Sequence, residues 1–233
     1  PLDSLLRKPV HSSRPKTMED CGQAYGYILY RAHPKHGGRG TLTIDGVHDF
    51  AVIHQGKRFL GMLDRRLHQK TLNISLASSQ PLDILVENMG RINFGPRLVN
   101  DTKGITGAVT LDGQEIEGWE MYPLPMTDLS ALEFSDEIAG RPAFYRGTFD
   151  LETTGDTFLD MRGWGKGCVW VNGRNLGRYW SLGPQRSLYL PAPWLKTGPN
   201  EVVVFDLFQA SSRTIRGSRD PIYDLTVKPE SPA

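Results

Sequence analysis

The feature that most constrains the fold of this chain is an internal repeat. Residues 49–61 read DFAVIHQGKRFLG, an apolar run followed by a glycine turn and a closing Leu-Gly, and residues 167–177 read GCVWVNGRNLG in the same order. The parallel continues downstream, where LNISL and LDILVEN in the first copy correspond to SLYL and EVVVFDL in the second. A repeated order of short segments predicts two copies of one structural module.

The apolar runs are short and rich in β-branched and aromatic residues, which favours strands over helices. We expect strands at 42–44, 50–53, 82–86, 145–151, 158–161, 168–171, 188–190 and 202–208. Short strands separated by turn residues are typical of β-sandwiches. Helix signals are limited to a short or irregular segment at 127–140 and a single turn at Pro193–Lys196. The predicted fold class is therefore all-β.

Two tandem antiparallel β-sandwich modules account for this pattern. We place the first module at residues 21–117 and the second at residues 141–227. Residues 1–20 are expected to be a linker from a preceding domain, residues 118–140 a linker between the modules, and residues 228–233 a tail. The chain begins without methionine in a polar stretch, so we expect a fragment of a longer protein.

Composition excludes several classes of partner. The 27 Lys and Arg residues nearly balance the 26 Asp and Glu residues, so no basic field attracts nucleic acid. No apolar stretch approaches the roughly 20 residues that span a bilayer, so we expect a soluble chain. The first residues also lack the apolar centre of a signal peptide. The compartment is left open, with a secreted or periplasmic parent protein among the options.

The densest aromatic stretch surrounds the Asn172-Gly173 step, the strongest short hairpin signal, because a type I′ turn needs positive φ at both central residues. Strand periodicity puts one set of side chains toward the core. Two interpretations of the nearby rings follow: core and interface packing, or an exposed platform on which a sugar stacks. The residues concerned are Trp164, Trp170, Tyr179 and Trp180.

Other constellations do not indicate catalysis or cofactors. His33 and His36 share a loop without a third metal ligand, so we expect no metal site there. Glu115 and Glu117 follow a turn and are interpreted as solvated charges. The chain has no phosphate-binding or nucleophile motif, and no cofactor is predicted.

Two further residue types give weaker information about the environment of the protein. The two cysteines, Cys21 and Cys168, are expected to remain buried thiols in different modules. The glycosylation sequons at Asn73 and Asn100 are few enough to arise by chance. Neither observation assigns a compartment.

The segment GWGKGCVWVNGRNLGRYWSLGPQRSLYLPAPWLKTGPNEVVVFDL closely resembles the C-terminal end of β-galactosidases of glycoside hydrolase family 35. TMEDCGQAYGYILYR resembles the segment that follows the catalytic barrel of that family, and ILVENMGRINFGPRLVNDTKGITGAVTLDG resembles the end of its first β-domain. The resemblance extends from about Thr17 to Leu225 and implies galactose-binding-like jelly rolls.

The resemblance also implies what this chain lacks. Retaining glycoside hydrolysis needs two carboxyl groups about 5 Å apart. The family carries both on an N-terminal (β/α)₈ barrel, which alone takes roughly 250 residues. We therefore assign no catalytic residue and expect a non-catalytic region that packs on the barrel of its own parent enzyme. A face built to pack on a barrel leaves an apolar patch, so self-association is expected, and a homodimer is left open.

One loop carries a functional expectation. The resemblance places residues 86–95, VENMGRINFG, near the mouth of the barrel, where Asn88, Arg91, Asn93 and Phe94 would line the leaving-group side of the substrate cleft. Relatives often have tyrosine at the position of Phe94, so the resemblance implies stacking there without the hydroxyl contact. The alternative interpretation is a loop that seals one domain against another. The rival function from another class is an autonomous galactoside-binding module.

Overall fold

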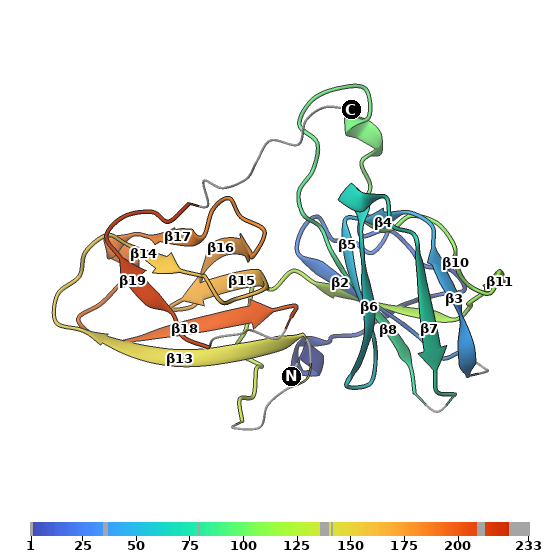
Figure 1. Ribbon diagram of the computed structural model, residues 1–233, viewed down its shortest axis with the longest axis horizontal. Coiled ribbons are helices and arrows are strands. Elements are labelled where there is room, and N and C mark those ends of the chain that lie inside the picture. Colours follow the sequence, from blue (N-terminus) through green and yellow to red (C-terminus); the bar gives the residue numbers. More distant parts are fainter. Residues whose placement is uncertain are drawn as a thin grey trace. The chain divides into compact units, whose positions relative to one another are not determined.

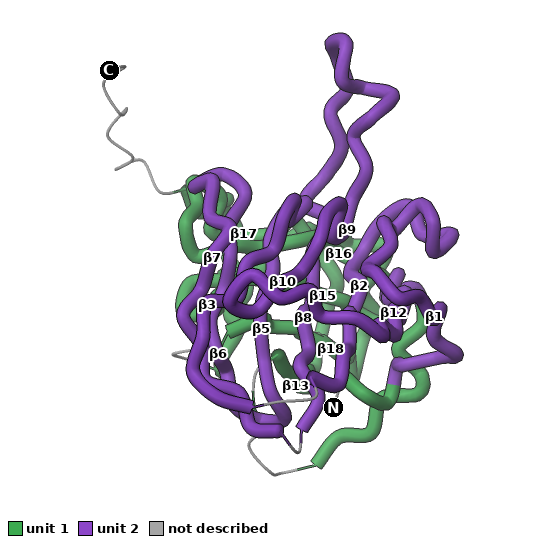
Figure 2. Tube along the Cα trace, turned by 90° about the vertical axis from the view of Figure 1, so that its right-hand side faces the viewer, with its two compact units in different colours: residues 1–4, 128–233 green, residues 5–127 purple. Residues whose placement is uncertain are grey.

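The computed structural model describes residues 2–34, 37–78, 80–135, 140, 142–208 and 213–223. The chain divides into two compact units (Figure 2). One unit consists of residues 5–127 and is called the first sandwich here; the other consists of residues 1–4 and 128–233 and is called the second sandwich. Both are built almost entirely of antiparallel strands, so the predicted all-β fold class is confirmed (Figure 1).

The first sandwich contains a six-stranded sheet and a four-stranded sheet. The strands of the larger sheet are, in spatial order, β1 (Val10–Ser12), β12 (Trp119–Leu124), β2 (Tyr27–Ala32), β8 (Leu82–Glu87), β5 (Phe50–Gln55) and β6 (Arg58–Asp64). Those of the smaller sheet are β11 (Gln114–Glu115), β10 (Val109–Leu111), β3 (Gly38–Ile44) and β7 (Thr71–Leu76). A two-stranded ribbon, β4 (Val47–His48) with β9 (Gly104–Ile105), and the short 3-10 turns η2 (Arg65–Leu67) and η3 (Leu98–Asn100) complete it.

The core of the first sandwich lies between its two sheets. Ile28, Ile53 and Ile84 of the larger sheet and Leu42 and Ile44 of the smaller sheet are fully buried in one apolar cluster. All six residues of β5 are buried, and β6 and β8 pair with it on either side. Burial of this apolar area supplies the main stabilisation of the unit.

The second sandwich contains a four-stranded sheet and a three-stranded sheet. The first comprises β13 (Ala143–Leu151), β18 (Gly198–Asp206), β15 (Lys166–Val171) and β16 (Arg174–Trp180), in that spatial order. The second comprises β17 (Ser187–Leu190), β14 (Thr157–Asp160) and β19 (Arg216–Ser218). The short 3-10 turns η1 (Leu2–Leu5) and η4 (Ala192–Trp194) lie outside both sheets. The core again lies between the sheets, where Val169, Val171 and Val204 pack with Leu159 and Leu190.

The topology of the two units confirms the repeat found in the sequence. The spatial order β2-β8-β5-β6 in the first sandwich corresponds to β13-β18-β15-β16 in the second. The order β10-β3-β7 corresponds in the same way to β19-β14-β17. Seven strands therefore match in both chain order and position. The repeated sequences 49–61 and 167–177 form the equivalent hairpins β5-β6 and β15-β16, each with a register shift.

The Asn172-Gly173 turn has the predicted conformation. Asn172 has φ of 48° and Gly173 has φ of 76°, as a type I′ turn requires. The side chain of Asn172 also holds the turn: its Nδ2 donates to the carbonyl of Trp194 at 2.8 Å, and its Oδ1 accepts from the amide of Glu201 at 3.0 Å.

Both predicted linkers differ from the structure. Within residues 1–20, Val10–Ser12 forms β1 and pairs with β12. Within residues 118–140, Trp119–Leu124 forms β12 and pairs with β2 along its whole length. Trp119 is 1% exposed, so this segment belongs to the core of the first sandwich. Large apolar side chains at alternate positions, Trp119 and Met121, place the strand there despite Pro123.

The helix predictions are met in part. The turn expected at Pro193–Lys196 is the 3-10 turn η4, which lies one residue earlier. Among the described residues of the segment 127–140, none is helical. The tail at 228–233, the end of the second module at 227 and His36 lie outside the described residues. No helix in the described part of the chain is long and apolar enough to cross a membrane.

Candidate functional site

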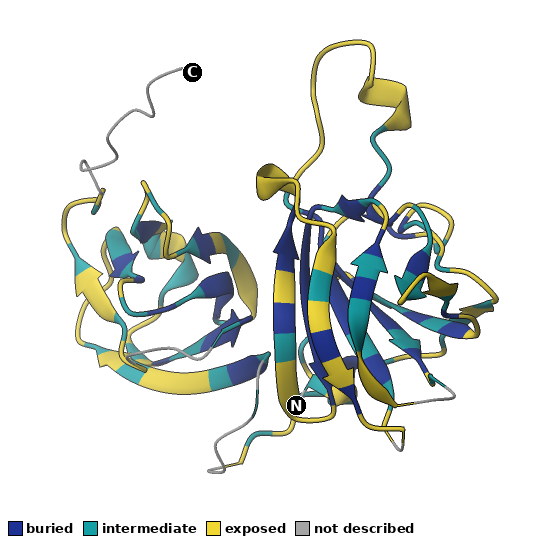
Figure 3. Cartoon of the chain, turned by 45° about the vertical axis from the view of Figure 1, so that its right-hand side comes forward, coloured by how far each residue is buried: buried dark blue, intermediate teal, exposed yellow. Residues whose placement is uncertain are grey.

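The most exposed apolar segment of the first sandwich is the connection between β8 and β9, which projects from one end of the unit (Figures 1 and 3). Four apolar side chains on it are open to solvent: Ile92 (41% exposed), Phe94 (90%), Leu98 (49%) and Val99 (87%). Most single exposed apolar residues need no explanation, but several on one loop indicate a contact surface. We call residues 91–100 the apolar loop.

Asn88 anchors the first end of the apolar loop. Asn88 is buried, and its Nδ2 donates to the carbonyl of Ala24 at 3.1 Å. Its own amide donates to the carbonyl of Gly26 at 3.1 Å, and its Oδ1 accepts from the amide of Gly90 at 3.0 Å. The chain therefore leaves β8 in a fixed direction.

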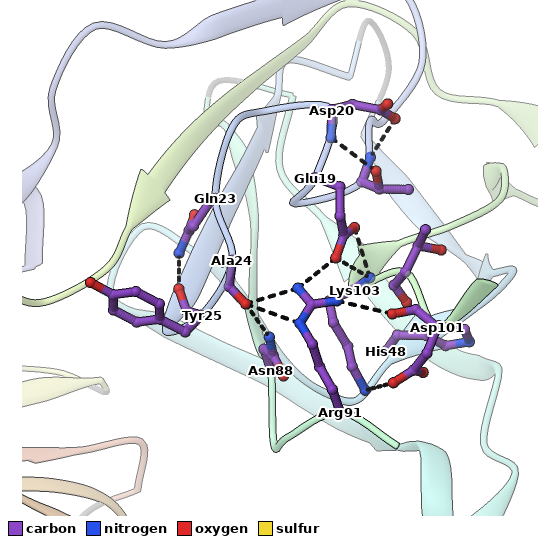
Figure 4. A network of polar contacts seen from close by, with 12 residues as sticks. Glu19, Asp20, Gln23, Ala24, Tyr25, His48, Asn88, Arg91, Asp101 and Lys103 are labelled. Carbon is purple, nitrogen blue, oxygen red and sulfur yellow. Dashed lines mark hydrogen bonds and ion pairs between the residues drawn. The ribbon is translucent and has the colours of Figure 1, made fainter. Parts of the chain in front are cut away.

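Arg91 joins both ends of the apolar loop to the segment before β2. Its Nη2 donates to the carbonyl of Ala24 at 2.8 Å, and its Nη1 donates to the carbonyl of Asp101 at 3.0 Å. Its guanidinium also forms an ion pair with Glu19 at 2.6 Å. Figure 4 shows these contacts converging on one arginine side chain.

Lys103 lies at the centre of the second anchor. Its side chain is 2% exposed, and its Nζ lies 3.0 Å from Asp49 and 3.3 Å from Asp101. Both carboxylates are also nearly buried, and Arg65 contacts Asp49 at 2.7 Å. Buried charges persist only where they are paired and hydrogen-bonded, and this cluster satisfies both conditions.

Two carboxylates beside Lys103 and Arg91, those of Glu19 and Asp101, have a lowered pKa. Burial acts to raise the pKa of Glu19, but the hydrogen bond from the amide of Lys103 and the contact with Arg91 outweigh it, so the pKa lies below its usual value. Burial likewise opposes the ionisation of Asp101, yet the amide of Ile92 and the ammonium of Lys103 lower its pKa overall. Near neutral pH, Glu19 and Asp101 are therefore ionised.

The four residues predicted for the substrate cleft separate into two groups. Asn88 and Arg91 meet on the carbonyl of Ala24 and act as anchors. Asn93 and Phe94 lie on the exposed part of the loop. Asn88 thus holds the first end of the loop, and Phe94 is exposed on it.

The ion cluster beneath the loop was not predicted; it consists of Glu19, Asp49, Arg65, Asp101 and Lys103. One signal was present. Asp49 immediately precedes a fully apolar run, and a carboxylate at the end of a buried strand needs a cation. The identity of that cation is not visible locally, because Lys103 lies 54 positions away in the sequence.

The aromatic stretch of the second sandwich is mostly core. Trp164, Trp170 and Tyr179 are 3%, 2% and 6% exposed, so their rings do not form an open platform for a sugar. Trp164 and Tyr179 pack in the core cluster, and Trp170 packs beside Phe144 on the other face of β15. Both faces of this strand are buried, so alternation did not separate core from surface. Trp180 is half-buried, with Nζ of Lys166 4.2 Å from its ring centroid.

The buried carboxylate of the second sandwich is Asp206, which accepts hydrogen bonds from the amides of Gly165 and Phe208 and from the hydroxyl of Tyr179. Burial outweighs these bonds and raises the pKa of Asp206 above its usual value. The bonds from Gly165 and Tyr179 tie Asp206 at the end of β18 to the start of β15 and to β16, and the bond from Phe208 holds the turn after β18.

The remaining candidates carry no reaction chemistry. Glu115 forms an ion pair with Arg14 at 2.7 Å, and Glu117 is exposed. Across the described residues, no group of three or more His, Cys, Asp or Glu side chains is arranged to hold a metal ion. The apolar loop on its charged base, with four exposed apolar side chains, is the candidate functional site.

Comparison with known proteins decides the family. Residues 15–125 match the family model described as "Beta-galactosidase, first all-beta domain", and residues 142–200 match "Beta-galactosidase, galactose-binding domain". The chain belongs to the β-galactosidase family. The two matched segments fall in the first and second sandwich respectively. This β-galactosidase segment therefore carries two all-β domains of the family in tandem.

Curated relatives agree with this assignment. A β-galactosidase of Xanthomonas manihotis is 44% identical over 79% of this chain and 31% of its own length. The human β-galactosidase-1-like protein 3 is 39% identical over 90% of this chain and 34% of its own length. The chain thus spans about a third of the length of these relatives. Among solved structures, a lectin from Pleurotus ostreatus in complex with GalNAc covers 94% of this chain and 81% of its own, but its TM-score of 0.32 and 14% identity are too low to support an argument.

Proposed function

We propose that this chain is the non-catalytic C-terminal region of an enzyme that releases terminal β-linked galactose, and that it packs on a catalytic barrel supplied elsewhere in the parent protein. Two matched family models and relatives three times as long support this proposal.

The observation that carries the proposal is the contrast between the apolar loop and the charged residues at its base. Phe94 and Val99 are 90% and 87% exposed, whereas Lys103 beneath them is 2% exposed and held by ion pairs. A rigid base loses no conformational entropy when a partner covers the tip. An exposed apolar tip on such a base is suited to burial against a partner surface. The partner is the mouth of the barrel, where the tip would form the leaving-group side of the substrate cleft.

Within that cleft, the aromatic ring of Phe94 is the contact for the substrate. Sugar rings present CH groups that stack on aromatic faces, and a phenyl ring supplies that contact without a hydrogen bond. Asn93 lies beside it and offers an amide for hydroxyl groups. Asn88 and Arg91 act indirectly, since their hydrogen bonds fix the direction of the loop.

The test is steady-state hydrolysis of β-galactosides by the parent enzyme with Phe94→Ala. We expect a higher KM for substrates with a sugar or aryl leaving group, because stacking contributes about 1 kcal/mol to binding. Leu182→Ala is the matched control, since Leu182 is an exposed apolar residue of the second sandwich. Unchanged KM and kcat in the Phe94 variant would contradict the proposed cleft position.

A second candidate function is autonomous galactoside binding, favoured by the galactose-binding description of the model that matches residues 142–200. Calorimetric titration of galactose and lactose into the chain separates the two. We expect no binding heat at millimolar sugar, because Trp164, Trp170 and Tyr179 are buried. Measurable binding without hydrolysis would instead support a binding module.

A further inference from the structure

β13 is the last strand of the four-stranded sheet in the second sandwich, and its outer edge pairs with no described strand. On the inner edge it pairs with β18 in an unbroken register over nine residues, from Ala143 opposite Asp206 to Leu151 opposite Gly198. Arg146, Gly147 and Thr148 at its centre are exposed. The strand contains neither a proline nor a bulge, which are common devices that protect an edge from pairing.

The repeat shows what belongs at such an edge. In the first sandwich, the equivalent strand is β2, and β12 pairs antiparallel with its outer edge from Trp119 opposite Ala32 to Leu124 opposite Tyr27. Trp119 and Met121 of β12 are 1% and 0% exposed in the core cluster. The described residues of the second sandwich provide no counterpart to β12.

A hollow lies against β13. Its volume is about 420 Å³, and residues 145–149 and Leu151 of β13 line it together with Trp164 and Ile215. Tyr145, Gly147, Phe149 and Leu151 alternate along β13 and share its inner face, and Arg146 and Thr148 also border the hollow. An added strand would therefore find an edge with no described partner strand and a mostly apolar space for its inward side chains.

We propose that a second copy of this chain occupies this edge, with the two β13 strands pairing antiparallel about a twofold axis. In such a pair, opposite residues must lie on the same face, so the register is centred on a residue. Centring on Thr148 places Arg146 opposite Asp150 of the partner subunit, and Gly147 opposite Phe149 of the partner subunit.

The charges of β13 select this register. Arg146 and Asp150 are its two charged residues, both exposed and on the outer face. Among registers that pair β13 residues with each other, only the one centred on Thr148 joins them as opposite charges, and it does so twice by symmetry. Centring on Arg146 or on Asp150 instead places like charges opposite each other, which is destabilising.

The inner face agrees with the same register. Gly147 has no side chain, and a β-carbon built on it would meet only Val202, at 3.6 Å. Phe149 of the partner subunit would lie opposite this open position and reach into the hollow. An aromatic side chain paired with a glycine on the neighbouring strand covers the gap that the glycine leaves.

Charge reversal tests the proposal in the chain as it stands. Sedimentation equilibrium of Arg146→Asp and of Asp150→Arg should each show a dimer dissociation constant raised about tenfold or more, because two attractive pairs become two repulsive pairs. The double variant Arg146→Asp with Asp150→Arg should restore the affinity of the original chain. Both residues are exposed, so circular dichroism should show an unchanged fold.

A cross-link locates the contact. Thr148→Cys should form an intermolecular disulfide on mild oxidation, because the two central residues lie directly opposite each other. The unmodified chain, with Cys21 and Cys168, is the control. A chain that stays monomeric at about millimolar concentration, single reversals that leave the dimer unchanged, or a Thr148→Cys variant that does not cross-link would each overturn the proposal. A monomer would mean that another segment of the parent protein covers β13.

Discussion

At the scale of single residues, the first sandwich depends on one buried cation. Lys103 lies between Asp49 and Asp101, and it reaches them from the strand end that closes the apolar loop. The pair does not add stability simply by being buried, since desolvation offsets much of the attraction. Its effect is to fix where residues 91–103 leave and rejoin the sandwich.

Removing that cation should therefore be costly. Lys103→Met leaves two nearly buried carboxylates with Arg65 as their main cation, and we expect the free energy of unfolding to fall by about 3–5 kcal/mol. Urea unfolding followed by circular dichroism measures the change. Lys57→Met, at an exposed lysine, is the control and should stay within about 0.5 kcal/mol of the original. A loss below about 1 kcal/mol for Lys103→Met would show that the cluster is dispensable.

Asn172 offers a second residue-scale prediction. Asn172→Gly and Asn172→Ala both remove the hydrogen bonds to Trp194, Asn200 and Glu201. Only the alanine must also hold a φ of 48°, so it should lower the free energy of unfolding by about 1 kcal/mol more than the glycine. Thermal unfolding of the pair measures the difference. Equal stability would show that the turn relaxes away from its left-handed conformation.

At the scale of elements, the sequence located strands better than it located the ends of the modules. The runs around β5, β8, β15 and β18 are continuous and apolar, so their assignment needed no tertiary information. β12 was missed because it lies outside the repeated segments and was assigned to the linker between them, and β1 because a three-residue edge strand carries almost no pattern. Both become visible only through their pairing with β2 and with each other.

The importance of β12 can be measured. Trp119 is 1% exposed, its Nε1 donates to the carbonyl of Ile116 at 2.7 Å, and its ring meets Tyr30 edge-on. Trp119→Ala should lower the free energy of unfolding of the first sandwich by about 3–5 kcal/mol. Denaturant titration with Glu117→Ala as the exposed control provides the comparison. If Trp119→Ala lowered the free energy of unfolding no more than the control does, residues 118–124 would behave as a linker and not as part of the core.

At the scale of the whole molecule, the candidate site was only partly predictable. Four of its residues lie close together in the sequence and could be recognised as a group, namely Asn88, Arg91, Asn93 and Phe94. The cluster below them joins residues from four separate segments, and no local pattern in the sequence specifies that meeting. The aromatic stretch does form a local pattern, but that pattern was ambiguous, because hairpins rich in aromatic rings occur both in cores and in binding platforms.

The same cluster makes the stability of the first sandwich depend on pH. Burial opposes the lowered pKa of Glu19 and of Asp101, but neighbouring amides and cations hold both pKa values below the usual 4.5 and 3.8. For a lowered pKa, the stabilisation is complete above the usual value and is lost as the pH falls through the folded value. We expect the melting temperature of the first sandwich to drop as the pH falls below about 4.5. Glu19→Gln should show a shallower drop, and parallel curves would rule out a contribution from Glu19.

The division into two units has a practical consequence through the cysteines. Cys21 is half-buried in the first sandwich and Cys168 is buried in the second, and neither forms a disulfide. Burial raises the pKa of the Cys21 thiol, which slows its reaction with alkylating reagents until the surrounding structure opens. Each sandwich therefore carries one native cysteine whose alkylation rate depends on local opening of that unit. The two alkylation rates, resolved by peptide mass, would report how often each half of the molecule opens without the introduction of any label.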